Sequence, residues 1–458
     1  MKKIRIGAAQ GFYGDTIEPA VLTAKYGDVQ YLCFDCLAEL TMAILAKDYA
    51  KNPSHGYTKD LTNSITQLLP FVKEKGIKLL TNAGGINPIA AKDEVMRIAK
   101  ELGMDGLKVA VVTGDNVLEN LPNWYEQGMD LSHADTKEPF ELEDKNWLFA
   151  NAYLGVWPIV EALQEGAQIV ITGRTTDPAQ FLAPLIYEFG WTKDEWDKLA
   201  SGIMMGHLLE CSAQSTGGNY SGDWGAVPRM ESIGYPIAEV EESGEFIITK
   251  IKEAGGLVSF DTVREQLLYE IHDPSAYLTP DVIVDLSKVT LTEVAPNKVR
   301  VTGIKGKSAP STLKVVLGYE NGFLGQALVG YSWPDAYKKA QKAQEIIMQK
   351  VEMQGNPFEK LQFDFVGYNS LHGPLATPPS EDINEIYLRI AVKAKSRSLA
   401  QAIQKYLPPL ALNGPPSLAG FFNTPPRQLL GMWSTLVDRQ LVEQHVQVKL
   451  EVVSCQYS

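Results

Sequence analysis

Short apolar runs alternate with amphipathic stretches along the first half of the chain. The apolar runs predict five strands, at Ile4–Ala8, Val29–Phe34, Lys78–Leu80, Leu107–Val112 and Gln168–Ile171. The stretches between them carry apolar residues at helical spacing and predict helices at Leu37–Ala50, Lys59–Lys75, Ile89–Leu102 and Asn151–Glu165. Strands and helices in this order predict an α/β fold with a mostly parallel sheet flanked by helices.

The clearest signals for the ends of helices and strands lie between residues 151 and 178. Pro158 suits the first turn of a helix, and Gly166 suits the position just after its end. The wholly apolar run that follows predicts a strand buried on both faces. Asp177 is then a good N-cap for the next helix, with Pro178 at its first position. The polar turn between strand and helix therefore lies at the carboxyl end of a buried strand, where open α/β proteins bind ligands.

Each of the five predicted strands ends in small or polar residues. Any one of them is more often a turn or cap residue than a ligand-binding residue. Five such ends would converge on one edge of a parallel sheet, so the set predicts a substrate site there. The candidate substrate-binding residues, including a later Gly-rich loop, are Asp15, Asn82, Gly84, Gly85, Thr113, Gly114, Asp115, Gly173, Arg174, Thr175, Gly217 and Gly218.

The second half of the chain has a different texture. Helices are predicted at Phe181–Gly190 and Glu195–Leu209, and hairpin-connected strands follow from about residue 237. Further strands are predicted at Thr312–Tyr319, Gln362–Val366, Ile386–Val392 and Val446–Val453, with helices at Tyr337–Val351 and Ser398–Tyr406. The pattern predicts an antiparallel α+β region, with domains at 1–287 and 288–458. The segment Glu119–Asp144 is interpreted as a surface excursion or a lid, and Asn413–Arg427 as a Pro-rich loop that fits an interface or a pocket wall.

Composition narrows the class of protein. Hydrophobic content of 45% and charged content of 21% are those of a globular chain with a sizeable core. A formal charge of −13 argues against nucleic acid as a partner. No run is long and apolar enough for a membrane span, the N-terminus is not typical of a signal peptide, and four cysteines make no disulfide framework. We therefore expect a cytoplasmic protein without a membrane partner.

Common cofactor and nucleophile motifs are absent. The chain has no G-x-G-x-x-G fingerprint, no P-loop and no G-x-S-x-G elbow, so the sequence identifies no cofactor. Cys33 and Cys36 form a lone C-x-x-C, which is a weak zinc signal, and two buried thiols are the better interpretation. No metal site is predicted from them.

Three residues are candidates for proton transfer: Glu210, Asp177 and His372. Glu210 shares a helix face with His207 and Cys211, at spacings of three and four residues, and a Gly-rich loop follows at once. The alternative is a helix terminus with a buried cysteine and a histidine near the helix dipole. Arg174 is the candidate cation, either to hold a substrate carboxylate or phosphate or to form a salt bridge with Asp177.

Four segments carry a family resemblance: NAYLGVWPIVEALQEGAQIVITGRTTDP, GHLLECSAQSTGGNYSGDWG, YEIHDPSAYLTPDVIVD and VGYNSLHG. With them the chain resembles the AtuA-like family, named for acyclic terpene utilisation. The resemblance implies a cytoplasmic protein associated with catabolism of branched acids through coenzyme A esters. It also implies a ferredoxin-like region, fused or as a separate small companion protein, which the residues after about 360 would match in part.

These observations support three hypotheses. The first is a lyase or hydratase acting on a carboxylate or acyl-CoA, in which Arg174 holds the anionic group and Glu210 or Asp177 moves a proton. The second is a non-catalytic subunit or scaffold that needs a small partner protein. The third and weakest is a metal-assisted hydrolase using Asp15, Asp35 and Asp115. A homo-oligomer is expected, while the substrate and the direction of reaction are left open.

Overall fold

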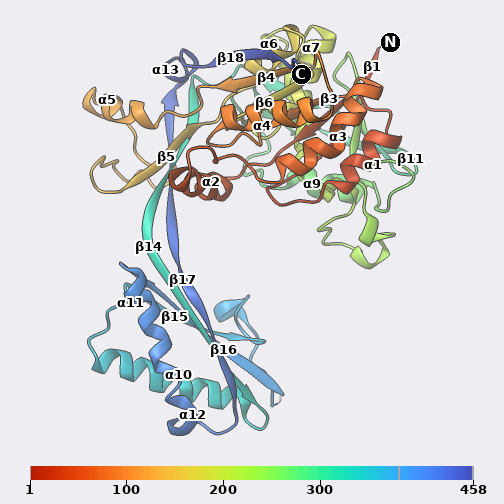
Figure 1. Ribbon diagram of the computed structural model, residues 1–458. Coiled ribbons are helices and arrows are strands. Elements are labelled where there is room, and N and C mark those ends of the chain that lie inside the picture. Colours follow the sequence, from red (N-terminus) through yellow and green to blue (C-terminus); the bar gives the residue numbers. More distant parts are fainter. Residues whose placement is uncertain (1, 380–381, 456–458) are drawn as a thin grey trace. The chain divides into compact units, whose positions relative to one another are not determined.

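The computed structural model describes residues 2–379 and 382–455, and the chain forms two compact units (Figure 1). Unit 1 comprises Met1–Leu317 and Met432–Ser458, and unit 2 comprises Gly318–Gly431. The chain leaves unit 1 within strand β14 (Thr312–Ser332) and returns within strand β17 (Leu418–Asp438). The domain boundary near residue 287 remains a prediction.

Unit 1 is built on a ten-stranded sheet whose centre is parallel. The strands β1, β2, β3, β6 and β4 lie side by side in this order and run parallel, as the sequence predicts. Antiparallel strands extend the sheet beyond β1 and beyond β4. In spatial order the ten strands are β11 (Thr290–Ala295), β12 (Lys298–Thr302), β8 (Phe246–Thr249), β7 (Ile237–Glu241), β1 (Lys3–Ala8), β2 (Tyr31–Phe34), β3 (Lys78–Thr81), β6 (Ile169–Thr172), β4 (Lys108–Thr113) and β18 (Gln447–Val452).

Helices cover both faces of the parallel strands (Figure 1). The helices α1 (Glu18–Tyr26), α3 (Leu61–Lys75) and α4 (Pro88–Glu101) share a core with Ile169 and Ile171 of β6. The helices α6 (Trp157–Gln164), α7 (Ala179–Phe189) and α8 (Trp196–Glu210) pack on the opposite face. All four residues of β6 are buried, which explains why its first three positions, Ile169–Ile171, form a continuous apolar run.

Smaller elements complete unit 1. They are α2 (Glu39–Lys51), α5 (Leu121–Glu126), β5 (Trp147–Ala152), α9 (Phe260–Leu268) and a three-stranded sheet of β9 (Tyr277–Leu278), β10 (Ile283–Asp285) and β13 (Lys305–Lys307). A short helix, α13 (Arg439–Glu443), precedes β18. No helix within the described residues is both long enough and apolar enough to cross a membrane.

Two local predictions around residues 151–178 are wrong. The predicted helix at Asn151–Glu165 begins too early, because β5 extends to Ala152 and α6 starts only at Trp157. Asp177 does not cap the next helix, which begins at Ala179 with Pro178 as its N-cap residue. The carboxylate of Asp177 instead accepts a hydrogen bond from Arg174.

Unit 2 has the ferredoxin-like arrangement that the resemblance implies. Its chain order is β14, α10 (Ala336–Met353), β15 (Lys360–Val366), β16 (Glu385–Ala394), α11 (Arg397–Gln401) and β17, and the sheet order is β15-β16-β14-β17. This is a split β-α-β pattern with antiparallel neighbours. The region begins near 318, earlier in the chain than expected.

The interpretation of Asn413–Arg427 as a loop is wrong for most of its length, since β17 begins at Leu418. Pro425 and Pro426 lie within this strand. Proline cannot donate to a sheet ladder, but β17 is at the edge of its sheet, where one side of the strand needs no partner. The Pro-rich composition therefore hid an edge strand.

Candidate functional site

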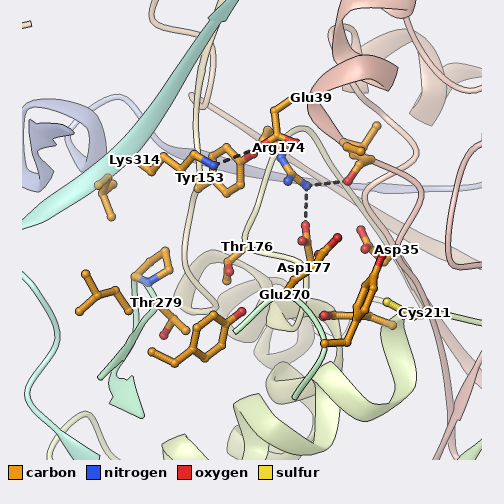
Figure 2. Close-up of a pocket in the computed structure, with 18 of the residues that line it drawn as sticks. Asp35, Glu39, Tyr153, Arg174, Thr176, Asp177, Cys211, Glu270, Thr279 and Lys314 are labelled. Atoms are coloured by element: carbon orange, nitrogen blue, oxygen red, sulfur yellow. Dashed lines mark hydrogen bonds and ion pairs between the residues drawn. The ribbon is translucent and has the colours of Figure 1, made fainter. Parts of the chain in front are cut away.

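A cavity of about 470 Å³ lies in unit 1 at the carboxyl ends of the parallel strands (Figure 2). Residues that follow β1, β2, β5 and β6 form part of its wall, together with the end of α8, the segment at 269–280 and the start of β14. Its polar lining includes Asp35, Glu39, Tyr153, Arg174, Thr176, Asp177, Glu210, Cys211, Tyr269, Glu270, Tyr277, Thr279, Thr312 and Lys314. The site is thus at the sheet edge that the sequence predicts.

Arg174 is held tightly in this wall, with only 3% of its surface exposed. Its Nη1 donates to Asp177 Oδ1 at 2.6 Å and to the carbonyl of Leu37 at 2.9 Å. The guanidinium carbon lies 4.0 Å from the ring centroid of Tyr153, a cation–π contact. Its Nε is buried without a partner among the described residues.

A second ion pair lies beside Arg174. Lys314 Nζ is 3.1 Å from Glu39 Oε1, and the same oxygen accepts a hydrogen bond from the hydroxyl of Tyr153 (Figure 2). Burial disfavours the charged form of Glu39, but the Tyr153 hydrogen bond and the charges of Lys314 and Arg174 outweigh it, so the pKa of Glu39 falls to about 2. We call Arg174, Asp177, Tyr153, Glu39 and Lys314 the Arg174 cluster.

Carboxyl groups that bond neither arginine nor lysine occupy another part of the wall. Asp35 is buried and accepts a hydrogen bond of 2.7 Å from Asn82 Nδ2. Burial raises its pKa well above the ordinary range, and the charges of Asp177 and Glu210 raise it further. Asp35 therefore keeps its proton to a higher pH than an exposed aspartate does.

Glu210 is 6% exposed and lies at the last position of α8. Its Oε1 is 2.8 Å from His207 Nδ1, whereas its Oε2 is buried without a partner in the described structure. Burial raises the pKa of Glu210 although the hydrogen bond with His207 opposes the shift. We call Asp35, His207 and Glu210 the Glu210 cluster.

The predicted site residues fall into two groups. Arg174, Asp177 and Glu210 line the cavity. Other predicted residues stand behind the lining, where Asp115 accepts from the backbone N–H of Arg174 at 2.7 Å and Asp15 accepts from that of Gly11 at 3.0 Å. Asn82 fills the same supporting role behind Asp35. The residues that do not line the cavity are Asp15, Asn82, Gly84, Gly85, Thr113, Gly114, Asp115, Gly173, Thr175, Gly217 and Gly218.

His372 is separate from these residues. It is exposed in unit 2, just before a short 3-10 helix at Gly373–Leu375. Gly173, in contrast, supports the site through its small size, because a Cβ there would lie 2.4 Å from Asp115 Oδ1.

Several lining residues escaped the sequence analysis. Tyr153 follows β5, but the helix predicted at Asn151–Glu165 included Tyr153 and the last two residues of that strand, so its place at a strand end was missed. Glu39 lies in the first turn of α2, and Lys314 comes from β14, far along the chain. Tyr277 and Glu270 lie in a segment that carries the family resemblance but no pattern that identifies binding residues. Only the position of Tyr153 had a usable signal, because it follows the short, mostly apolar run Trp147–Ala152.

Metal ligation has no geometric support in the described part of the chain. Over residues 2–379 and 382–455, no group of three or more His, Cys, Asp or Glu side chains could hold a metal ion. Cys33 and Cys36 are buried free thiols whose pKa values are raised by burial.

Together the fold and cavity define an α/β protein with a cavity at the carboxyl ends of its parallel strands and a ferredoxin-like unit inserted late in the chain. The family model described as "Acyclic terpene utilisation family protein AtuA" matches residues 4–448. The chain belongs to this family, and membership implies a role in acyclic terpene utilisation. Comparison with curated proteins and with solved structures finds no match.

Proposed function

We propose that the protein is an enzyme of the lyase or hydratase type that acts on a carboxylate or acyl-CoA in acyclic terpene or branched-acid degradation. The observation that carries the proposal is Glu210, a buried cavity carboxyl with one oxygen bonded to His207 and the other without a partner. A buried carboxyl with a raised pKa keeps its proton to a higher pH than an exposed glutamate does, which suits it to give and take protons. Asp177 is less suited, because its carboxylate is bonded to Arg174.

Elimination of water from a hydroxyacyl group needs two proton transfers. One group takes a proton from the carbon next to the carbonyl, and another gives a proton to the leaving hydroxyl. Glu210 and Asp35 supply two buried carboxyls for these steps. The reverse sequence adds water.

The cations of the cavity wall are already paired with carboxylates. This favours an acyl-CoA thioester over a free carboxylate as the substrate. Of the described residues that line the cavity, Arg174 and Lys314 are the cationic ones, and each already bonds a carboxylate. A free carboxylate would have to compete with Asp177 or Glu39 for them. The acyl end of a thioester is neutral and needs no unpaired cation.

Hydrogen exchange tests the proposal without knowledge of the full reaction. The protein is incubated in D₂O with branched acyl-CoA thioesters and, separately, with the free acids, and mass spectrometry follows deuterium uptake next to the carbonyl. We expect uptake with a thioester and a loss of about a hundredfold or more in Glu210→Gln, because general acid–base groups contribute about 10²–10⁴-fold. His55→Gln, which changes an exposed histidine outside the cavity wall, is the matched control and should exchange normally.

Measuring thermal stabilisation by the same ligands distinguishes a failure to bind from a failure to catalyse. A ligand that binds the native state raises the unfolding midpoint whether or not chemistry follows. Binding of a thioester without exchange in the wild-type protein would contradict the enzyme proposal. It would favour the alternative of a non-catalytic subunit that needs a small companion protein.

A further inference from the structure

The pair formed by His207 and Glu210 has a fixed arrangement of protons. His207 Nε2 lies 2.9 Å from the backbone carbonyl of Gln266 in α9, and Nδ1 lies 2.8 Å from Glu210 Oε1. A carbonyl can only accept, so Nε2 must carry a proton. The side chain of Gln266 donates in turn to the carbonyl of His207 at 2.8 Å, which fixes the two helices against each other.

This arrangement leaves two states for the other ring nitrogen. In one, the unprotonated Nδ1 of neutral His207 accepts a hydrogen bond from the protonated carboxyl of Glu210. In the other, the imidazolium donates Nδ1–H to the Glu210 carboxylate. Both states keep one proton between Nδ1 and Oε1, and they differ only in which atom holds it.

We propose that His207 is a positioning residue that stores the proton exchanged through Glu210, so that the carboxyl group acts with an imidazole behind it. This inference rests on the proposed function and deepens it. When Oε2 takes a proton from the substrate carbon, the proton on Oε1 moves to Nδ1, and the positive charge comes to rest on His207. In the return step Oε2 gives its proton up and Nδ1 returns one to Oε1, so protons and charge balance.

Burial and the surrounding charges are consistent with this role. Burial disfavours the imidazolium, but the hydrogen bond and the charge of Glu210 outweigh it and raise the pKa of His207. The titratable groups that face the pair come from several elements besides α8: they are Asp35, Asp177, Cys211, Glu270 and Tyr277. These neighbours are acids or neutral groups. None of them places a positive charge beside the pair that would oppose the imidazolium of His207.

The first experiment needs no substrate. The full chain is labelled with ¹⁵N-histidine, and NMR follows the ring nitrogens of His207 against pH in the wild type and in Glu210→Gln. We expect Nε2 to stay protonated throughout and the midpoint of the His207 titration to fall in the variant, because burial then acts without the carboxylate. The exposed His272 is the internal control. An unprotonated Nε2 in the neutral ring, or an unmoved midpoint, would overturn the inference.

The second experiment uses the deuterium exchange described above. His207→Gln keeps a hydrogen-bonding group beside Glu210 but removes the basic nitrogen. We expect the exchange rate to fall about a hundredfold with half-saturation by substrate unchanged, and the pH profile to lose the limb due to His207. The double variant with Glu210→Gln should be no slower than Glu210→Gln alone, because the two residues act as one unit.

A purely structural histidine would behave differently. It would lower the melting temperature, leave the shape of the pH profile unchanged and combine multiplicatively with Glu210→Gln. If His207→Gln does not fold, the NMR comparison of wild type and Glu210→Gln still decides the shared proton. The NMR comparison can show the shared proton while the wild type exchanges no substrate proton. In that case the proposed function and the proton-storage role of His207 are both wrong, and only the proton shared by His207 and Glu210 is confirmed.

Discussion

At the Arg174 cluster the two cations of the cavity wall each bond a carboxylate, whereas the carboxyls of the Glu210 cluster have only neutral or proton-sharing partners. The Arg174 cluster has its charges paired before any ligand arrives, although Arg174 Nε has no partner among the described residues. The Glu210 cluster keeps an unpartnered oxygen on a buried side chain, at a cost in stability. Under the proposed function, this difference assigns the first cluster to holding the shape of the cavity and the second to proton transfer.

The largest expected effect on stability comes from Arg174→Met. Removing one partner from a buried ion pair costs about 3–5 kcal/mol, and we expect a value near the lower end because Asp177 is partly exposed. Denaturant unfolding measures this loss, and ligand affinity is measured on the same proteins. Arg174→Lys keeps the charge but not the planar guanidinium, so it should fall between wild type and Arg174→Met. Little change in stability with a ten- to hundredfold loss of affinity, on the order of 1.4–2.7 kcal/mol, would instead assign Arg174 to substrate binding.

A smaller effect concerns pH and Asp115, which supports Arg174 from behind. Burial raises the pKa of Asp115 to about 6 despite its hydrogen bonds with Arg174 N and Asn151. Because the folded state binds the proton more tightly than the unfolded state, its contribution to stability is complete below about pH 4 and is lost as the pH rises through about 6. The shift corresponds to roughly 2–3 kcal/mol.

Asp115→Asn should remove that part of the pH dependence. Unfolding free energies of the variant and the wild type, measured from pH 4 to pH 7, should therefore converge at low pH and diverge at high pH in favour of the variant. Asp28→Asn, an exposed aspartate, is the control and should follow the wild type. If the wild type instead became more stable relative to Asp115→Asn as the pH rises from 4 to 7, the expected direction of this pH dependence would be wrong.

The third effect concerns the thiols beside the Glu210 cluster. Cys36 N donates to Asn82 Oδ1, and Asn82 in turn holds Asp35, so a metal bound there would change the cluster completely. Cys33→Ser with Cys36→Ser should leave metal content and proton exchange unchanged and cost about 1–2 kcal/mol for each buried hydroxyl. Metal analysis of both proteins checks this, and a stoichiometric metal that disappears in the double variant would contradict it.

Different sequence signals identified some residues of the Arg174 cluster and of the Glu210 cluster, and left others out. The strand ending at Thr172 was recognisable because its apolar run is bounded by glycines, so Arg174 and Asp177 were placed correctly at the sheet edge. Glu210 was found from helical spacing. His207, three residues before it, was left open, because spacing alone does not show that Gln266 fixes its ring.

Long-range contacts explain most of the remaining misses. Lys314 reaches Glu39 across 275 positions of the chain, and no periodicity encodes such a pairing. The end strand β18 joins β4 from the far C-terminal region for the same reason. The ferredoxin-like unit was expected only through the family resemblance, and the Pro-rich composition of β17 concealed its fourth strand.

The smallest expected effect is that of Lys314→Met, and it measures how far the Arg174 cluster depends on its outer ion pair. Lys314 and Glu39 are 43% and 38% exposed, so solvent screens their attraction, and exposed pairs contribute about 0.2–1 kcal/mol. We expect a loss of about 0.5 kcal/mol at neutral pH, because the Tyr153 hydrogen bond to Glu39 remains. The lowered pKa of Glu39 fixes the sign: its contribution is present at neutral pH and is lost as the pH falls below the ordinary glutamate range towards about 2. A double-mutant cycle with Glu39→Gln isolates the pair, and its coupling should shrink at high salt. A tenfold loss of ligand affinity in Lys314→Met, with stability unchanged, would instead make Lys314 a substrate-binding cation and would remove the argument that the cavity favours a neutral acyl end.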